Sequence, residues 1–329
     1  MSKTAVITGI TGQDGALLSK YLLDKDYTVV GIDRRTSSPT NWRLKELGVT
    51  GNPKFSIASG DITDQGSIQN ILQSVQPDEI YNLAAQSFVG SSWQIPVHTM
   101  DVTGTGALKV FDAAKHVCPE ARIYQASSSE MFGGENRTET FDENSTFYPR
   151  SPYGVAKVAA HWSAINYRES YNMHVSCGIL FNHESEYRGL EFVTRKVTDA
   201  VAKISLGKQE KLQLGNLDSV RDWGYAPDFV EAMWLMLQQE RPDDYIIATG
   251  KTHNIAQLCE FAFSRVGIKN WRDYVELGPD RPADVKHLQG NYNKAFMQLG
   301  WSPKMGFKNM VAKMVDKDVE RNSSENFTR

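Results

Sequence analysis

The sequence contains few cysteines and begins without a long apolar run. Its three cysteines, Cys118, Cys177 and Cys259, lie far apart and form no Cys-x-x-Cys pair, which argues against both a disulfide framework and a zinc site. The N-terminal segment reaches glycines and Asp14 before any long apolar stretch, so it resembles neither a secretory signal nor a membrane span. We therefore expect a cytoplasmic protein without a bound metal.

The sequence also lacks a large excess of either charge. Its formal net charge is -3 at pH 7, which gives no broad attraction for polyanions, so neither nucleic acid nor an anionic membrane is an expected partner. The hydrophobic fraction of 40% and the charged fraction of 23% are those of an ordinary globular protein. An anionic ligand would have to be held by a local group of cations.

The order of apolar patterns along the chain predicts a layered α/β fold. Short β-branched runs alternate with stretches of helical spacing, and we expect strands at residues 3–8, 28–32, 79–84, 122–127 and 174–181. Strands that alternate with helices predict a parallel sheet covered on both faces. The predicted fold class is therefore α/β, a Rossmann-type doubly wound parallel sheet with a smaller C-terminal α/β substrate-binding part.

A change in composition after residue 181 suggests the domain boundary. From there the chain is richer in loops and in Arg, Lys, Gly and Asn. We expect a dinucleotide-binding domain over 1–181, with a returning segment near 220–250, and a substrate-binding part over 182–321. Residues 322–329 are expected to form a frayed tail.

A glycine-rich loop connects the first expected strand to the first expected helix. Gly9, Gly12 and Gly15 allow a tight turn and a close approach of the backbone to a pyrophosphate, which the N–H groups of the following helix can bind. A plain turn is the simpler alternative, but the position between strand and helix favours a dinucleotide. Asp61 stands at the end of a further expected strand, between those at 28–32 and 79–84, and is placed either to accept a hydrogen bond from the adenine amine or to cap a helix.

The end of the second expected strand gives opposing signals about the cofactor. Asp33 stands where a carboxylate bonds the ribose hydroxyls of NAD and repels a 2′-phosphate. Arg34 and Arg35 follow directly, and paired guanidinium bonds to phosphate favour NADP. Composition alone leaves both cofactors open.

Two further motifs indicate acid–base chemistry. Tyr153 and Lys157 are four residues apart, on one face of a helix that Pro152 can begin, and a nearby ammonium favours the phenolate form of a tyrosine. Ser127–Glu130 follow an expected strand at the edge where open α/β sheets bind ligands. A chance helical pair and a serine-rich turn are the simpler alternatives, but their order along the chain lets both motifs meet the glycine loop in one pocket.

The sequence resembles the extended short-chain dehydrogenase/reductases and, within them, the GDP-mannose 4,6-dehydratase family. The resemblance extends from about residue 3 to residue 320 and rests on TGITGQDG (8–15), YNLAAQS (81–87), YQASSSE (124–130), FYPRSPYGVAK (147–157), GILFNHES (178–185), EFVTRKV (191–197), RDWG (221–224), VEAMWLMLQ (230–238) and RPAD (281–284). The chain departs from the family pattern at Ser128, usually threonine, at Asp33, at Glu186–Tyr187 and at Lys286.

This resemblance implies a lyase that converts GDP-mannose to GDP-4-keto-6-deoxymannose, on a GDP-fucose or GDP-rhamnose route of deoxysugar biosynthesis. Tyr153 would take the C4 hydroxyl proton while hydride leaves C4, and Ser128 would bond the C4 oxygen. Glu130 would remove the C5 proton and help the C6 hydroxyl leave as water, after which hydride returns to C6. Lys157 would also hold the nicotinamide ribose.

The resemblance also implies the binding residues and an NADP-dependent homotetramer, with NAD as the alternative that Asp33 suggests. The implied cofactor-binding residues are Gly9, Gly12, Gln13, Asp14, Asp33, Arg34, Arg35, Asp61, Ile62, Leu83, Ala85, Ser87, Tyr153, Lys157, His183 and Arg188. The implied substrate-binding residues are Ser87, Ser128, Asn182, Glu184, Lys196, Arg221 and Arg281. The loop Arg34–Ser38 would reach the cofactor site of a neighbouring subunit.

Three other functions remain open at this point. The chain could act on another GDP-sugar, such as a GDP-heptose, with the same chemistry. It could be a 4-reductase or 4-epimerase, although such an enzyme has no use for the carboxylate of Glu130. It could be a regulator that senses a nicotinamide dinucleotide, although Glu130, Tyr153 and Lys157 would then serve no purpose together.

Overall fold

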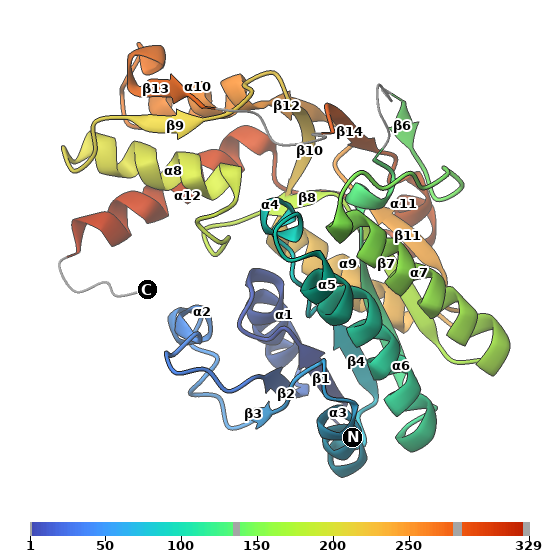
Figure 1. Cartoon of the computed structure of the whole chain (residues 1–329). Coiled ribbons are helices and arrows are strands. Elements are labelled where there is room, and N and C mark those ends of the chain that lie inside the picture. The colour runs from blue at the N-terminus through green and yellow to red at the C-terminus, as the bar shows by residue number, and fades with distance from the viewer. Residues whose placement is uncertain (1, 134–138, 279–284, 325–329) are drawn as a thin grey trace.

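The structure is a computed structural model that describes residues 2–133, 139–278 and 285–324. A seven-stranded parallel sheet forms the centre of the larger lobe, in the order β11-β7-β5-β4-β1-β2-β3 (Figure 1). Its strands are β1 (Thr4–Thr8), β2 (Thr28–Asp33), β3 (Phe55–Ser59), β4 (Glu79–Asn82), β5 (Arg122–Ser128), β7 (Val175–Leu180) and β11 (Asp244–Ile247). The strand order reverses beside β1, between β2 and β4, and such a point opens a crevice at the carboxyl ends of the strands.

Helices cover both faces of this sheet. They are α1 (Gln13–Asp24), α3 (Gln65–Val75), α6 (Gly106–Val117), α7 (Pro152–Tyr171) and α9 (Ala226–Gln238). Ala5 and Ile7 of β1 belong to the same apolar core as α1 and α9, whereas the intervening Val6 belongs to the core formed with α3, α6 and α7. Because both rows of side chains are buried, the central strands are nearly continuous apolar runs rather than alternating ones.

The smaller lobe is built around a second sheet. Its strands are β6 (Thr140–Phe141), β8 (Asn182–Glu184), β10 (Val220–Tyr225), β12 (Thr252–Asn254) and β14 (His287–Gly290), and a two-stranded sheet of β9 (Leu212–Leu214) and β13 (Val275–Leu277) accompanies it. The helices of this lobe are α8 (Val193–Ser205), α10 (Ile255–Arg265) and α12 (Phe307–Ser323). Their shared core includes Trp223, Leu258 and Met314.

The fold class predicted from the sequence is confirmed. Within the segment 220–250, α9 and β11 return to the larger lobe and β11 pairs with β7, whereas β10 belongs to the second sheet. Helix α12 continues through the start of the expected tail, where the Asn322 amide donates to the Asp199 carboxylate at 3.1 Å. Residues 325–329 lie outside the described part of the chain.

Short elements complete the described chain. They are α2 (Trp42–Glu46), α4 (Val89–Ser92), α5 (Pro96–Thr99), the π-helix η1 (Met100–Thr105), the 3-10 helices η2 (Ser129–Met131) and η3 (Trp271–Tyr274), and α11 (Asn293–Leu299). In this part of the chain, no helix combines the length and the apolar character that crossing a membrane requires.

Candidate active site

A cavity of about 1240 Å³ lies at the carboxyl ends of the central strands. The glycine loop, the ends of β2, β4 and β5, the start of α7 and the segment from β8 to α8 all contribute to its lining. Every described residue that the sequence assigned to cofactor or substrate lines this cavity, except Arg35, which lines an adjoining hollow. Arg281 lies outside the described residues.

The glycine loop leaves no room for side chains where it crosses the strand ends. Gly9 has a positive φ of 68°, and a Cβ built on it would lie 2.9 Å from the backbone nitrogen of Ala84. A Cβ on Gly15 would lie 2.4 Å from the Gly9 carbonyl oxygen. Helix α1 begins at Gln13 behind Gly12, which offers no capping side chain to its first N–H groups. This backbone cradle at a helix N-terminus fits a dinucleotide pyrophosphate.

Asp14 and His183 form a buried pair that connects the first helix to the smaller lobe. His183 Nε2 lies 2.8 Å from Asp14 Oδ2, and His183 Nδ1 lies 2.8 Å from the Phe181 carbonyl oxygen. Both ring nitrogens thus face acceptors, which favours the doubly protonated imidazolium. Burial alone would lower the pKa of His183, but the Asp14 carboxylate outweighs it and raises that pKa. Burial acts in the opposite direction on Asp14, yet His183 holds its pKa down at about 2.

Asp33, the last residue of β2, forms no ion pair with the two arginines that follow it. Asp33 is half-buried, and its Oδ2 accepts a long hydrogen bond of 3.5 Å from Thr40. Burial raises the pKa of Asp33 above its ordinary value. Among the described residues, neither Arg34 nor Arg35 forms an ion pair with Asp33. Instead, both arginines line the adjoining hollow together with Asp61.

Asp61 lies on the cavity wall and organises the turn that follows β3. Its Oδ1 accepts hydrogen bonds from the backbone nitrogen and the hydroxyl of Thr63, at 2.9 and 2.8 Å. The N-cap of α3 is Asp64, whose side chain accepts from the Gly66 nitrogen at 3.1 Å. The capping alternative for Asp61 is therefore wrong.

Ser128, Glu130, Tyr153 and Lys157, which we call the β5–α7 wall, meet on one side of the cavity. Ser128 ends β5 and caps η2, because its hydroxyl accepts from the Glu130 nitrogen at 3.2 Å. On α7, the Tyr153 phenol bonds the Ser128 hydroxyl. The Lys157 ammonium donates to the Ala126 carbonyl at 2.6 Å and lies 5.7 Å from the centre of the Tyr153 ring.

The electrostatics of this wall differ from the sequence-based expectation. Burial raises the pKa of Tyr153 to about 12, with Glu130 adding to the rise and the Ser128 bond opposing it. Burial also lowers the pKa of Lys157 to about 8, although Asp14 acts against that change. A lysine ammonium that lowers the phenol pKa was expected, but the desolvation of both groups is the larger effect. Tyr153 therefore holds its proton near neutral pH.

Polar groups converge on the substrate end of the cavity. The side-chain oxygen of Asn182 is buried and has no hydrogen-bond partner among the described residues, which makes it a candidate to bind a ligand. Glu184 forms an ion pair with Arg188 at 3.1 Å and accepts the Thr194 hydroxyl. Lys196 and Arg221 reach the lining from α8 and β10 and supply cations there.

Sequence reasoning missed Arg43, which also lines the cavity. Its guanidinium donates to the Thr11 carbonyl in the glycine loop at 3.0 Å and to the Tyr187 carbonyl at 2.6 Å. Burial lowers its pKa to about 10. Arg43 thus joins the glycine loop to the segment that follows β8. No local pattern indicates this role, because both partners are brought to α2 by the fold.

Comparisons with known proteins agree with this geometry. A family model described as GDP-mannose 4,6 dehydratase matches residues 6–314. GDP-mannose 4,6 dehydratase 1 of Arabidopsis thaliana is 47% identical over 328 residues, which cover 97% of this chain and 90% of that protein. The Homo sapiens GDP-mannose 4,6 dehydratase is 44% identical over 342 residues, which cover 96% of this chain and 91% of that protein.

Solved structures show the same fold at lower identity. The dTDP-glucose 4,6-dehydratase DesIV of Streptomyces venezuelae has a TM-score of 0.88 at 23% identity, covering 97% of this chain and 98% of that chain. The UDP-glucose 4-epimerase of Thermus thermophilus has a TM-score of 0.84 at 23% identity, covering 96% and 98%. Dehydratases and epimerases share this scaffold, so the fold alone does not choose between the two reactions.

Proposed function

Because the chain belongs to the GDP-mannose 4,6-dehydratase family, we propose that it converts GDP-mannose to GDP-4-keto-6-deoxymannose. The observation that carries this proposal is the β5–α7 wall, where a hydroxyl, a carboxylate, a phenol and an amine line one side of the cavity. These groups are the ones needed to oxidise a sugar at C4 and then to remove water across C5 and C6.

Tyr153 and Ser128 act at the C4 oxygen of the sugar. Their hydroxyls bond each other, and both residues line the cavity, so a sugar hydroxyl would meet them together. Ser128 bonds the C4 oxygen. Tyr153 accepts the proton of the C4 hydroxyl once a positive charge beside the phenol lowers the pKa of Tyr153 from about 12. Lys157 holds its ammonium behind the phenol, and its lowered pKa of about 8 lets it exchange protons near neutral pH.

Glu130 is the base that acts at C5. Its charge contributes to the raised pKa of Tyr153, and both side chains line the same cavity. A ketone at C4 acidifies the C5 proton, which Glu130 removes and then delivers to the departing C6 hydroxyl. A 4-epimerase or a 4-reductase has no such step, so this carboxylate favours the dehydratase over that alternative.

We propose NADP as the cofactor. The Gly9–Gly15 cradle would hold its pyrophosphate, and the hollow lined by Arg34 and Arg35 would take the 2′-phosphate through paired guanidinium bonds. When bound, the nicotinamide would accept hydride from C4 and return it to C6, while Tyr153 would give C5 the proton that it took from the C4 hydroxyl. NAD remains the alternative, because Asp33 stands at the same end of the cavity.

The local cations support a nucleoside-diphosphate sugar as the substrate. Lys196 and Arg221 line the cavity of a protein whose net charge is -3, and they would bind the diphosphate of a GDP-sugar. Asn182, with its unpartnered oxygen, would bind the sugar or the nucleotide. A GDP-heptose offers the same diphosphate, so these contacts favour a GDP-sugar without distinguishing mannose from heptose.

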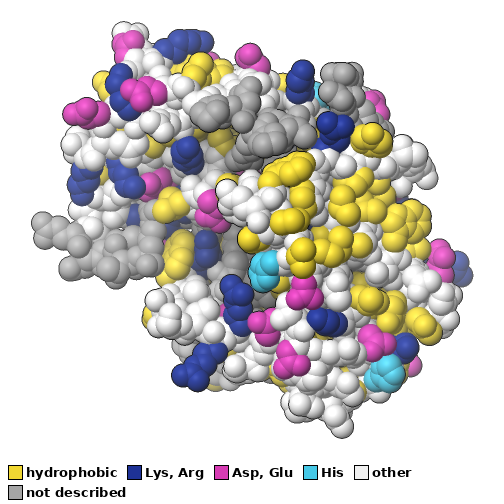
Figure 2. Space-filling view, viewed as in Figure 1, with side chains coloured by type: hydrophobic (Ala, Val, Ile, Leu, Met, Phe, Trp, Pro, Cys, Tyr) yellow, Lys and Arg dark blue, Asp and Glu magenta, His cyan; other side chains and the backbone are white. Residues whose placement is uncertain are grey.

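We further propose a cytoplasmic homotetramer. Figure 2 shows hydrophobic side chains gathered over the helices around α5 and α7. Val97, Val155 and Trp162 are 82, 44 and 56% exposed on these helices, and Val155 and Trp162 lie two helical turns apart on one face of α7. A second copy of the chain would cover them, and the loop Arg34–Ser38 would reach a neighbouring cofactor site. Sedimentation that shows only monomer at micromolar concentration would contradict this assembly.

The decisive experiment is an incubation of the pure holoenzyme with GDP-mannose, followed by mass spectrometry of the nucleotide sugar. The proposal requires a product lighter by one water without any added reductant. A product of unchanged mass but altered stereochemistry would indicate an epimerase. No reaction with GDP-mannose, together with water loss from a GDP-heptose, would identify the other substrate.

A further inference from the structure

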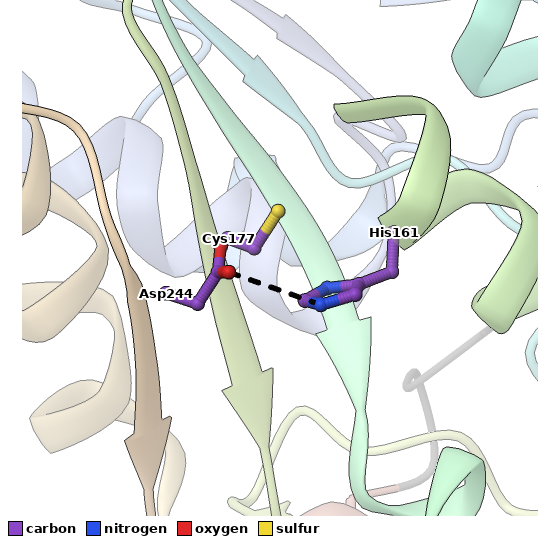
Figure 3. A group of neighbouring side chains, drawn as sticks. All are labelled: His161, Cys177 and Asp244. Carbon is purple, nitrogen blue, oxygen red and sulfur yellow. Dashed lines mark ion pairs between the residues drawn. The ribbon is translucent and has the colours of Figure 1, made fainter. Parts of the chain in front are cut away.

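A buried polar cluster lies directly behind the β5–α7 wall. His161 of α7, Cys177 of β7 and Asp244 of β11 meet there, with His161 pointing toward Asp244 (Figure 3), and Ser127 of β5 joins them through His161. The Ser127 hydroxyl and His161 Nδ1 are 2.8 Å apart, and both side chains are almost fully buried. Ser127 lines the cavity, whereas the other three residues stand behind the lining. The proposed chemistry assigns no role to this cluster.

The neighbours of the cluster argue against a metal ion. Both oxygens of Asp244 accept hydrogen bonds from the guanidinium of Arg168, at 3.0 and 2.9 Å. His161 Nδ1 is used by Ser127, and His161 Nε2 is 4.0 Å from Asp244 Oδ2. Burial lowers the pKa of His161 and raises that of Cys177, so the ring and the thiol are both neutral near pH 7. A divalent cation would have to lie beside the charge of Arg168 and displace its bonds to Asp244.

We propose that His161 is a positioning residue that sets the direction of the Ser128 hydroxyl through its bond to Ser127. This proposal rests on the function proposed above. It makes His161 part of the reaction machinery without contact to substrate or cofactor.

The geometry of α7 supports this role. Tyr153, Lys157 and His161 recur every four residues, so they lie on one face of the helix. Each bonds a group at the end of β5: Tyr153 bonds the Ser128 hydroxyl, Lys157 the Ala126 carbonyl, and His161 the Ser127 hydroxyl. Three successive turns of α7 are thus bonded to three successive residues of β5.

The alternation of side chains along a strand converts this bond into a directional constraint. Ser127 and Ser128 are neighbours, so their side chains leave β5 toward opposite faces. A bond that fixes Ser127 against α7 therefore also fixes the direction in which Ser128 leaves the strand. The rings of Phe147 and His161 meet edge to face at 5.1 Å, which restricts rotation of the imidazole. Because reacting groups must be held closely, a small rotation of Ser128 would slow the reaction more than it would weaken binding.

The experiment tests the two ring nitrogens of His161 one at a time, with variants that keep a polar group at only one of the two positions. In His161→Asn, the side-chain amide reaches the place of Nδ1 and can still bond Ser127. In His161→Gln, the amide reaches the place of Nε2, next to Asp244, and the bond between residue 161 and Ser127 is lost. His161→Leu removes both polar positions. Ser163→Ala is the matched control on α7, because the Ser163 hydroxyl bonds the Ala159 carbonyl within its own helix.

We expect His161→Leu and His161→Gln holoenzymes to lose about tenfold to a hundredfold in kcat, with KM for GDP-mannose and the affinity for NADP little changed. His161→Asn should recover most of the lost kcat, and Ser163→Ala should match the wild type. Recovery of kcat in His161→Gln instead of His161→Asn would overturn the proposal, because the turnover rate would then depend on the ring nitrogen that faces Asp244. Unchanged kcat in all variants, or stoichiometric zinc in the purified holoenzyme, would also overturn it.

A second measurement separates this proposal from the proposed function. Amide hydrogen exchange at Ser128–Glu130 does not depend on which sugar the enzyme uses. Faster exchange in His161→Leu and His161→Gln, with exchange close to wild type in His161→Asn, supports the positioning role even if GDP-mannose is not the substrate. Equal exchange in all four proteins contradicts it, even if the wild type dehydrates GDP-mannose.

Discussion

Polar groups at the two ends of the cavity are held in opposite ways. In the β5–α7 wall, the phenol and the ammonium are buried, and each bonds a group on β5. At the β2 end, which we define as Asp33, Arg34 and Arg35, the two arginines are exposed, and neither pairs with the carboxylate beside it. The first region is fixed before any ligand arrives, whereas the second combines two solvated arginines with a half-buried carboxylate.

This difference predicts different consequences of mutation. Buried groups that are bonded to one another act at the reacting atoms, where their loss changes the rate. Exposed cations act through solvent-screened attraction, so their loss changes the affinity for the cofactor and makes it less dependent on salt.

Tyr153→Phe and Glu130→Gln should each lower kcat by about two orders of magnitude or more, because each removes an acid–base group. Folding and NADP binding should change little in both variants. Their intermediates should differ: the Glu130 variant still oxidises C4 and should accumulate reduced nicotinamide absorbance, whereas the Tyr153 variant should show none. Near wild-type turnover in either variant would remove that residue from the mechanism.

At the β2 end, Arg35→Ala should weaken NADP binding by about tenfold while kcat at saturating NADP stays close to wild type. NAD binding should hardly change, because NAD carries no 2′-phosphate for Arg35 to bind. Titration of cofactor-stripped protein with both dinucleotides at two salt concentrations measures this. The control is Lys45→Ala, which removes an exposed charge of the same sign from α2. A fall in kcat at saturating NADP would contradict the expectation that the β2 end affects only the affinity for the cofactor.

Because the Asp14–His183 pair is buried, its ionisation should make the stability of the fold depend on pH. The pKa of His183 is raised on folding, so its stabilisation is present below its unfolded pKa and is lost as pH rises through the folded value. The pKa of Asp14 falls from 3.8 to about 2, so its contribution is present above 3.8 and is lost as pH falls toward 2. The pair therefore stabilises the fold most between about pH 4 and the unfolded His pKa of 6.5, and its contribution declines as pH rises through the folded pKa of His183.

Asp14→Asn should lower the free energy of unfolding at pH 6 by about 2 kcal/mol, the value that corresponds to the shift of Asp14. The difference from wild type should shrink as the pH rises through the folded pKa of His183. Urea unfolding at several pH values measures it. Asp24→Asn on the same helix is the control, because its exposed pair with Lys20 should contribute little. An equal loss of stability at every pH would assign the effect to packing rather than to charge.

The sequence predicted those features of the site that depend on local order along the chain. The glycine loop precedes α1, Ser128 and Glu130 follow β5, and Tyr153 and Lys157 share a face of α7, all as expected. Their grouping follows from the parallel sheet, because the carboxyl ends of its strands share one edge.

The features that escaped prediction depend on contacts between distant segments. The raised pKa of Tyr153 reflects its burial, which the Tyr–Lys spacing does not report. Arg43 bonds Thr11 and Tyr187, and the latter is far away in the sequence. His161 bonds Ser127, but a lone histidine on a helix gives no sign of such a partner.

The smallest expected effect concerns Asp33, where the buried and the exposed regions meet. The carboxylate is half-buried and lines the cavity, its contact with Thr40 is long at 3.5 Å, and it forms no ion pair with either arginine. A 2′-phosphate held by Arg34 and Arg35 would therefore lie near a like charge that the backbone and the charge of Arg34 stabilise only in part. We expect the wild type to bind NADP more tightly than NAD, and Asp33→Ala to tighten NADP binding by a further few-fold while weakening NAD. Calorimetric titration of stripped protein with each dinucleotide measures both changes.

Tighter binding of NAD by the wild type would show that the carboxylate, rather than the arginines, governs this end of the cavity. If Asp33→Ala leaves both affinities unchanged, the carboxylate turns away from the ribose, and the two arginines alone select the cofactor.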